Sequence, residues 1–393
     1  MTTHPVILTI NSGSSSIKFS LFSDDEICTN LYYGNIDIHT DNKQSILRIF
    51  DAKHNKLKDE VIQSIEYTTL FHTIINWIDT VAKLVSVGHR VVHGGQYFTQ
   101  PVIINETIIK QIEELIPLAP LHQIHNVEAI KIIAKQYPHI KQCACFDTSF
   151  HITQFYLAKL FALPRDLIDA GIIRYGFHGL SYEYIASVLP KYIGEIGHKK
   201  VIVQHLGSGS SVCALNNGKS VATSMGFTAL DGLMMGSRCG SLDPGVILYL
   251  LQEKKYSAEY ISKILYHDSG LLGVSNGISS DMRELITSNN KYAIEAIELF
   301  CYRVACEIGS LSVSLGGCDA IVFTAGIGEH IPIIRQKICA YLEFLGIKLD
   351  PIKNDRNEII ISDSSSSIIV SVIPTNEEYM IAHHTRSILQ SKL

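Results

Sequence analysis

The chain has 393 residues, of which 46% are hydrophobic and 18% charged, and its net charge is −5. This length exceeds the usual size of a single hydrophobic core, so we expect a soluble globular protein with two domains. The negative net charge argues against a general nucleic-acid binder, because phosphate backbones are bound by basic surfaces.

No leader or membrane segment is expected. The N terminus lacks a basic region followed by an apolar core, and no segment approaches the roughly 20 apolar residues that span a bilayer. The nine cysteines are an odd number without a CxxC pair, which favours reduced thiols in a cytoplasmic protein.

Strands dominate the first fifty residues. Apolar runs predict strands at 6–11, 16–22, 30–38 and 45–50, whereas the polar residues 51–60 predict a loop. Apolar residues at helical spacing follow at 69–84, 106–118 and 125–137, and a strand that contains VSVGHRVV separates the first two of these helices. The next apolar strand, QCACF, ends at Asp147.

The same organisation begins again at residue 201. VIVQHLGSGSSVCAL repeats the strand, Gly/Ser turn and strand of VILTINSGSSSIKFSLF, so a duplicated domain is favoured over two unrelated hairpins. A strand with the glycine turn 326–328 follows, and the last strand leads to a helix with Thr375 and Glu378 as a capping box. The predicted domains are 1–147, completed by a helix at 378–393, and 148–377.

The turn NSGSSS has two interpretations. Gly13 accommodates positive φ and serines suit a turn, so this segment alone favours a plain hairpin over a phosphate-binding loop. No GxxxxGK[ST] motif indicates a P-loop, and no GxGxxG joins a strand to a helix as in a Rossmann oxidoreductase. Two facing hairpin loops would suit a nucleotide between duplicated domains that close over its phosphates.

The chain resembles the acetate kinase family over residues 6 to about 385, through NSGSSSIKF, RVVHGG, FDTSFH, RYGFHGLSYEYI, QHLGSGSS, MGSRCGSLDPG, SSDMRE, FTAGIGEH and IPTNEE in this order. The resemblance implies an α/β fold of duplicated ribonuclease-H-like (actin-type ATPase) domains with an active-site cleft between them. It also implies reversible, Mg²⁺-dependent transfer of the ATP γ-phosphoryl group to acetate, giving acetyl phosphate and ADP, in a homodimer.

The resemblance assigns residues to the carboxylic acid. Arg90 is implied to bind the acetate carboxylate, since a guanidinium can hold a carboxylate through two hydrogen bonds; a structural salt bridge is the alternative. The positions that match the pocket for the acetate methyl group, each of which core packing would also explain, are Val92, Leu121, Phe177 and Ala229. Val92 favours acetate over propionate, but one methylene discriminates by only about 1–3 kcal/mol, so both acids are expected to react.

The implied catalytic residues are Asp147, His178 and Arg238. His178 and Arg238 would contact the equatorial oxygens of the transferring phosphoryl group. In phosphoryl transfer, proteins act mostly by positioning the reactants and neutralising their charge. A structural histidine and a solvated loop cation are the alternatives. Acetate, with a pKa of about 4–5 by comparison with Asp and Glu, is already ionised and needs no general base. Asp147 is therefore expected to orient the site or to hold Mg²⁺, rather than only to cap a turn.

Asn11 and Glu377 match the metal-associated positions, and oxygen ligands suit Mg²⁺. For Glu377 the alternative is a favourable interaction with a helix dipole. In the family context the first hairpin loop is interpreted as a phosphate site. The implied nucleotide-binding residues are Ser14, Ser16, Lys18, His205, Leu206, Gly207, Ser208, Gly209, Asp281, Met282, Arg283, Ala325, Gly326, Ile327, Gly328 and Glu329.

Three positions depart from the family's pattern. Ser208 stands where the family usually has Asn, which removes an amide that both donates and accepts. Ser241 stands where an acid often lies, so Arg238 would lack that orienting partner. Ala229 replaces a proline and would widen the methyl pocket, against the effect of Val92.

Three alternatives to an acetate kinase are open. One is a kinase for propionate or another short-chain acid. Another is a nucleotide-driven scaffold of the same superfamily, which is disfavoured because a scaffold has no use for an acid-binding Arg90. The third is an inactive family member, in view of Ser208 and Ser241.

Overall fold

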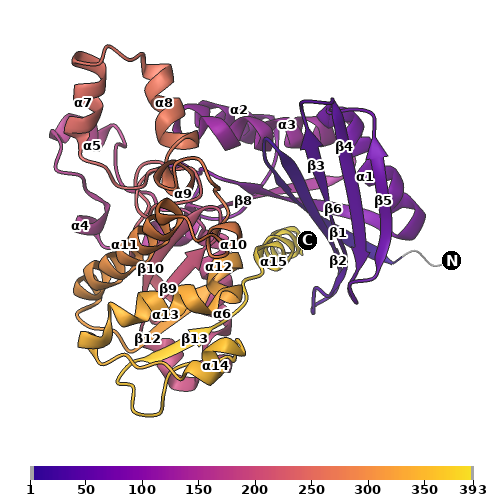
Figure 1. Ribbon diagram of the computed structural model, residues 1–393. Coiled ribbons are helices and arrows are strands. Elements are labelled where there is room, and N and C mark those ends of the chain that lie inside the picture. The colour runs from indigo at the N-terminus through magenta and orange to yellow at the C-terminus, as the bar shows by residue number, and fades with distance from the viewer. Residues whose placement is uncertain (1–3, 391–393) are drawn as a thin grey trace. The chain divides into compact units, whose positions relative to one another are not determined.

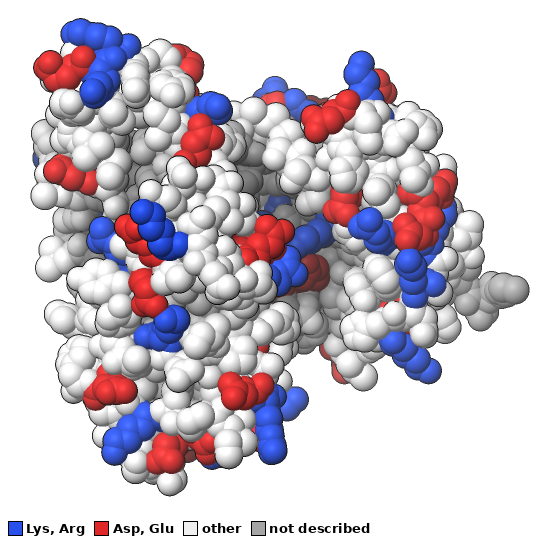
Figure 2. All heavy atoms as spheres, in the orientation of Figure 1, with Lys and Arg blue, Asp and Glu red and all other residues white. Residues whose placement is uncertain are grey.

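The computed structural model describes residues 4–390, with the exception of the Leu121 side chain (Figure 1). Within this range the chain forms two compact units, one made of residues up to Phe150 together with those from Asn376, and one of His151–Thr375. Acidic and basic side chains are interspersed on the face that Figure 2 shows. None of the helices in the described range is long and apolar enough to cross a membrane.

The first unit is built on an eight-stranded sheet. Its strand order is β5-β4-β3-β2-β1-β6-β8-β7. The strands are β1 (Pro5–Ser12), β2 (Ser16–Ser23), β3 (Asn30–His39), β4 (Gln44–Asp51), β5 (Lys56–Ile62), β6 (Lys83–Val91), β7 (Val102–Ile103) and β8 (Lys141–Phe146). The predicted loop at 51–60 is therefore wrong in its second half, which begins β5. This strand lies at the edge of the sheet and is mostly exposed, so it lacks the apolar pattern of a buried strand.

Helices cover the sheet of the first unit. These are α1 (Tyr67–Val81), α2 (Glu106–Glu114), α3 (Pro120–Gln136) and α15 (Glu377–Gln390). Alternate residues of β1 pack against different helices. Leu8 shares a buried cluster with Phe71 of α1, and Ile7 shares one with Ala382 of α15. Gly88 of β6 allows α15 to approach closely, because a Cβ there would clash with the Thr385 side chain. The first residue of α15 is Glu377.

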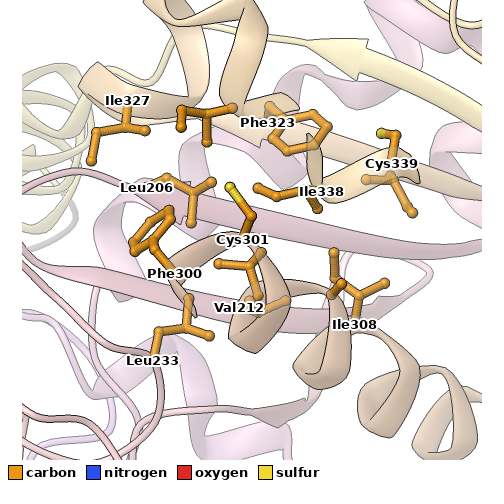
Figure 3. Close-up of a cluster of buried hydrophobic side chains, with 14 of the residues drawn as sticks. Leu206, Val212, Leu233, Phe300, Cys301, Ile308, Phe323, Ile327, Ile338 and Cys339 are labelled. Carbon is orange, nitrogen blue, oxygen red and sulfur yellow. The ribbon is translucent and has the colours of Figure 1, made fainter. Parts of the chain in front are cut away.

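The second unit is built on a five-stranded sheet of order β11-β10-β9-β12-β13. The strands are β9 (Lys200–Leu206), β10 (Ser210–Asn216), β11 (Lys219–Thr223), β12 (Ala320–Thr324) and β13 (Ile369–Val372). The helices are α4 (Tyr156–Lys159), α5 (Arg165–Asp169), α6 (Gly179–Ile193), α7 (Pro244–Gln252), α8 (Ala258–His267), α9 (Gly270–Val274), α10 (Met282–Leu285), α11 (Lys291–Leu315), α12 (Ala325–His330), α13 (Pro332–Ala340) and α14 (Pro351–Asp355). In its core, Phe300 and Ile308 of α11 pack with Val212 of β10 and Phe323 of β12 (Figure 3).

The two sheets share one topology. In the order β3-β2-β1-β6-β8 the first three strands are antiparallel neighbours and the last two join in parallel, and β11-β10-β9-β12-β13 repeats this arrangement. The predicted duplication is therefore confirmed. The hairpins β1–β2 and β9–β10 occupy equivalent places in the two sheets.

The start of the last helix differs from the expectation. Asn376, not Thr375, caps α15, because its Oδ1 accepts a hydrogen bond from the Tyr379 N–H at 2.9 Å. The Thr375 hydroxyl lies 2.8 Å from the Ser181 hydroxyl instead. At α7, Asp243 is the capping residue, since its Oδ1 accepts from the Gly245 N–H at 2.8 Å, and Pro244 is the first helical residue.

Candidate active site

Three polar residues gather at the ends of adjacent parallel strands in the first unit. β1, β6 and β8 are parallel neighbours, and Asn11, Arg90 and Asp147 lie at or just beyond their carboxyl ends. Arg90 Nε donates to Asp147 Oδ1 at 2.9 Å and Arg90 Nη2 to Asp147 Oδ2 at 2.5 Å. Arg90 Nη1 donates to Asn11 Oδ1 at 3.1 Å. These bonds use three of the five N–H groups of Arg90, so at most two remain for a substrate carboxylate.

This ion pair is well shielded from solvent. The Asp147 side chain is 2% exposed and that of Arg90 is 19% exposed. Burial lowers the pKa of Arg90, but the nearby carboxylates of Asp147 and Glu377 outweigh it, and the net effect is a raised pKa. Asp147 therefore holds a permanently charged guanidinium in one orientation. The salt bridge that the sequence left as an alternative is present, and the binding of acetate by Arg90 stays a prediction.

Glu377 adds a further carboxylate to this group. It is partly buried, and its pKa is raised to about 7, chiefly by burial; Arg90 opposes the rise, whereas Asp147 and Glu378 add to it. A carboxylate that burial and neighbouring acids disfavour is one that a cation would stabilise. The oxygens of Asn11, Asp147 and Glu377 are the hard donors that Mg²⁺ prefers.

The side chains alone do not form a complete metal cage. Among the described residues, no group of three or more His, Cys, Asp or Glu side chains is placed to hold a metal ion. Mg²⁺ usually takes one or two protein carboxylates and completes its shell with water and substrate phosphates. The donor set around Glu377 therefore fits a Mg²⁺ ion that arrives with a nucleotide.

A second group of predicted residues converges in the second unit. His178 caps α6 in a left-handed conformation, with φ of 57°, and its ring stacks on that of His205 at 4.2 Å between centroids. A Cβ placed on Gly209, in the β9–β10 turn, would lie 3.3 Å from His178 Nε2 and 3.4 Å from Arg238 Nη2. The tips of His178 and Arg238 thus meet at the glycine of the hairpin loop.

Arg238 is anchored by the backbone. Its Nη1 donates to the Ala229 carbonyl at 2.7 Å. Ser241 donates to Asp231 Oδ1 at 2.7 Å, and Arg174 pairs with the other oxygen of Asp231 at 3.1 Å. Arg238 therefore has an orienting partner despite the serine.

The remaining residues that were predicted to bind phosphate or adenosine come from both units. In the first unit, Gly13 N donates to Ser16 O at 2.9 Å across the turn, Ser14 is exposed, and the exposed Lys18 lies opposite Asn11. In the second, Gly207 N donates to Gly209 O at 3.1 Å, and Ser208 is exposed. The neighbouring Leu206 is fully buried.

Two residues predicted to contact adenosine, Asp281 and Glu329, bind other groups of the protein. Asp281 caps α10 and forms a salt bridge with Arg283 at 2.5 Å, while Met282 is buried. Glu329 Oε1 accepts from the N–H groups of Ala325 at 2.7 Å and Thr375 at 3.1 Å, so its carboxylate holds the backbone at the start of α12.

The glycine turn itself forms part of α12. Ala325, with φ of 64°, is the first residue of this helix. Gly326 is exposed with open space at its Cβ position, whereas Ile327 and Gly328 are buried.

Two of the residues predicted to contact the acetate methyl group are buried. Val92 is 4% exposed in the first unit, and Phe177 is 1% exposed in the second, where its carbonyl lies 2.9 Å from His151 Nε2. Ala229 is partly exposed. The side chain of Leu121 lies outside the described residues.

The acetokinase family model matches residues 6–383. The chain belongs to the acetokinase family. It is 48% identical to an acetate kinase of Rhodopseudomonas palustris strain TIE-1, covering 96% of this chain and 97% of the relative, and 46% identical to one of Rickettsia typhi over 98% and 99%. Two solved structures have the same fold. A propionate kinase from Francisella tularensis has a TM-score of 0.91 at 37% identity, over 98% and 100% of the chains. The acetate kinase of Porphyromonas gingivalis has a TM-score of 0.87 at 36% identity, with the same coverage.

Membership of the acetokinase family confirms three predictions made from the sequence. These are the family itself, the fold class, and a phosphotransferase activity with a carboxyl group as acceptor. The scaffold alternative is thereby removed.

Several polar residues that hydrogen-bond His178 and His205 were not predicted from the sequence. Ser211 Oγ lies 2.8 Å from His178 Nδ1 and 2.5 Å from the Tyr182 hydroxyl. Ser181 Oγ lies 2.8 Å from His205 Nδ1 and 2.8 Å from the Thr375 hydroxyl. Ser181 and Tyr182 are part of RYGFHGLSYEYI and Ser211 of QHLGSGSS, so the motifs contained them, but no pattern in the sequence pairs them with a histidine.

We expect Glu377→Gln to stabilise the metal-free acetokinase, by an amount that grows from pH 5 to about 3 kcal/mol near pH 7.5. The folded protein raises the pKa of this carboxyl from 4.5 to about 7, so between these values it retains a proton that the unfolded chain has released. Wild-type stability therefore falls as pH rises through this window. Urea unfolding in EDTA measures the difference. Glu26→Gln, at an exposed position of the same unit, is the control, and the same pH dependence in both variants would contradict the assignment.

Proposed function

We propose that this acetokinase transfers the γ-phosphoryl group of ATP to acetate in a Mg²⁺-dependent, reversible reaction, and that each unit supplies one group of functional residues. The group around Arg90 binds the acid. The group formed by His178, Arg238 and the β9–β10 turn holds the phosphoryl group. The observation that carries this assignment is the approach of His178 Nε2 and Arg238 Nη2 to the same point beside Gly209.

The acid side of the reaction requires orientation rather than proton transfer. Acetate is ionised at neutral pH and can attack phosphorus through its own oxygen. Both oxygens of Asp147 accept hydrogen bonds from Arg90, which suits a residue that positions the guanidinium and not one that removes a proton. Arg90 then presents its remaining N–H groups to the acetate carboxylate.

The phosphoryl side of the reaction requires neutralisation of charge. Phosphoryl transfer spreads negative charge over three equatorial oxygens, and catalysis consists mainly of positioning and electrostatic stabilisation. Arg238 contributes a permanent cation, and His178 contributes Nε2. When bound through Asn11, Asp147 and Glu377, Mg²⁺ would add positive charge on the nucleotide phosphates.

Acetate is the proposed acid, and propionate is the second candidate because the Francisella structure with this fold is a propionate kinase. We expect ADP formation that depends on both Mg²⁺ and an added acid, with the acyl phosphate trapped by hydroxylamine. Acetate should exceed propionate in kcat/KM by about 10- to 100-fold, since one methylene is worth about 1–3 kcal/mol. ATP hydrolysis that is indifferent to acid would contradict the proposal.

Val92 is the residue expected to limit the size of the acid that can bind. Val92→Ala should raise kcat/KM for propionate relative to acetate by about tenfold, because the removed methyl groups make room for one more carbon. Val61→Ala, at a position 52% exposed on β5, is the matched control. An unchanged ratio of the two acids in Val92→Ala would remove this residue from the pocket.

We also propose that the protein is a homodimer that associates through α7. Every residue of this helix is at least partly exposed, and Val246, Leu248, Tyr249 and Leu251 are 38–52% exposed. A helix that is apolar on several sides is normally covered. Light scattering should give twice the chain mass of 43.6 kDa, and Leu248→Glu combined with Leu251→Glu should give the monomer. Ile27→Glu, at another exposed apolar position, is the control, and a persistent dimer in the α7 variant would refute this interface.

A further inference from the structure

We propose that Ser211 and Tyr182 are positioning residues for His178 in phosphoryl transfer. Both side chains are fully buried, and they form a short chain of hydrogen bonds from His178 Nδ1 to Ser211 Oγ at 2.8 Å and on to the Tyr182 hydroxyl at 2.5 Å. The inference rests on the proposed function, in which His178 Nε2 contacts the phosphoryl group.

The fold places this chain behind the imidazole. Tyr182 lies one helical turn after His178, so the two residues share a face of α6, and its N–H donates to the His178 carbonyl at 3.1 Å. Ser211 comes from β10, immediately after the turn that contains Gly209. Nδ1 therefore faces the buried hydroxyls while Nε2 faces Gly209 and Arg238. The hydrogen bond at Nδ1 therefore fixes the orientation of the ring and leaves Nε2 directed at Gly209 and Arg238.

The chain of hydroxyls suits both protonation states of His178. If Tyr182 donates to Ser211 and Ser211 donates to Nδ1, the neutral ring carries its proton on Nε2 and can donate to a phosphoryl oxygen. If His178 becomes cationic, Ser211 can turn and accept from Nδ1–H, because a hydroxyl both donates and accepts. In either state the atom that faces the phosphoryl group is an N–H donor.

The neighbouring charged and titratable groups define the setting of this histidine. His205 of β9 stacks on the ring, Arg238 approaches Nε2 from its loop, and Tyr182 lies behind Ser211. Like charges at stacking distance and next to a guanidinium disfavour a second cation. The neutral form with Nε2–H, which the serine and tyrosine support, is therefore the form suited to work beside Arg238.

The same unit contains a matched control. Ser220 is also a fully buried serine, and its Oγ lies 2.9 Å from Nδ1 of the buried His151. His151 Nε2 faces the Phe177 carbonyl rather than the β9–β10 turn. Ser220→Ala therefore removes a similar hydrogen bond from a similar place without touching His178.

The test compares Ser211→Ala, Tyr182→Phe, their double variant, His178→Ala and Ser220→Ala in the full-length protein. We expect Ser211→Ala to lower kcat about 10- to 100-fold with KM for acetate changed less than about twofold, since a small misplacement of a catalytic group costs about this much. The double variant should lose little more than Ser211→Ala, because both substitutions act through one ring. Ser220→Ala should keep kcat within about twofold of the wild type.

The pH profile separates positioning from general damage. Ser211 hydrogen-bonds Nδ1 in the neutral and in the cationic ring, so the limb of the kcat profile that reports His178 should shift in Ser211→Ala and not in Ser220→Ala. Equal kcat values and pH profiles for Ser211→Ala and Ser220→Ala would overturn the inference. Tyr182→Phe, which keeps the ring volume, provides the same comparison should Ser211→Ala fail to fold. A wild-type kcat in His178→Ala would overturn the proposed role of His178 itself, whereas a loss in His178→Ala without one in Ser211→Ala would overturn only the positioning.

Discussion

Replacement of Arg238 by alanine should lower kcat by about 1000-fold, while KM for acetate and the affinity for ATP change by less than about threefold. An arginine that stabilises a transferring phosphoryl group matters most when negative charge has spread over its equatorial oxygens. Its contribution is therefore realised in the transition state and hardly at all in binding. Steady-state kinetics with acetate, together with a direct measurement of ATP binding, separates the two effects.

Arg238→Lys distinguishes charge from shape. Lysine restores the positive charge, but it cannot both donate to the Ala229 carbonyl and present a second nitrogen in a rigid plane towards Gly209. We expect it to recover no more than about tenfold of the loss. Arg356→Ala, at an exposed arginine of the same unit, serves as the control. A change confined to KM for acetate in Arg238→Ala would contradict the assignment.

Local sequence patterns were sufficient for the duplicated part of the fold. A strand, a turn rich in Gly and Ser and a second strand form a hairpin from contacts between near neighbours, so β1–β2 and β9–β10 could be predicted from composition and spacing alone. The edge strand β5 was missed because KLKDEVI has one buried residue, and a charged, exposed edge has the composition of a loop. Such a strand is fixed by pairing with β4, which the sequence does not display.

The site shows a second limit of sequence reasoning. Arg90 and Asp147 are 57 positions apart, and His178 and Ser211 are 33 apart, so their contacts depend on strand register and on the placement of α6. From the sequence, each of these four residues could be recognised as polar and placed near the end of a strand or helix. Whether Arg90 would face an internal carboxylate could not be decided, since an arginine fork suits a substrate acid and an aspartate equally well.

Arg90→Ala is expected to raise KM for acetate by about 100-fold and to leave ATP binding within about threefold of the wild type. The loss corresponds to charge-assisted hydrogen bonds to the acid, which are worth about 1.5–3 kcal/mol. The same substitution should also lower the free energy of unfolding by about 3–5 kcal/mol, because it leaves the nearly inaccessible Asp147 carboxylate without its partner. Stability and acid binding therefore have to be separated.

The double variant Arg90→Ala, Asp147→Asn makes this separation. It removes the unpaired charge together with the arginine, so most of the lost stability should return while KM for acetate stays raised. Asp147→Asn alone is the reference, since it keeps Arg90 but replaces the charged acceptor by a neutral amide. If Arg90 only held the strand ends together, the double variant, once stable, would use acetate with the KM of Asp147→Asn. If Arg90 also binds the acid, the two will differ by about 100-fold, because no other residue assigned to the acid in the first unit carries a permanent positive charge.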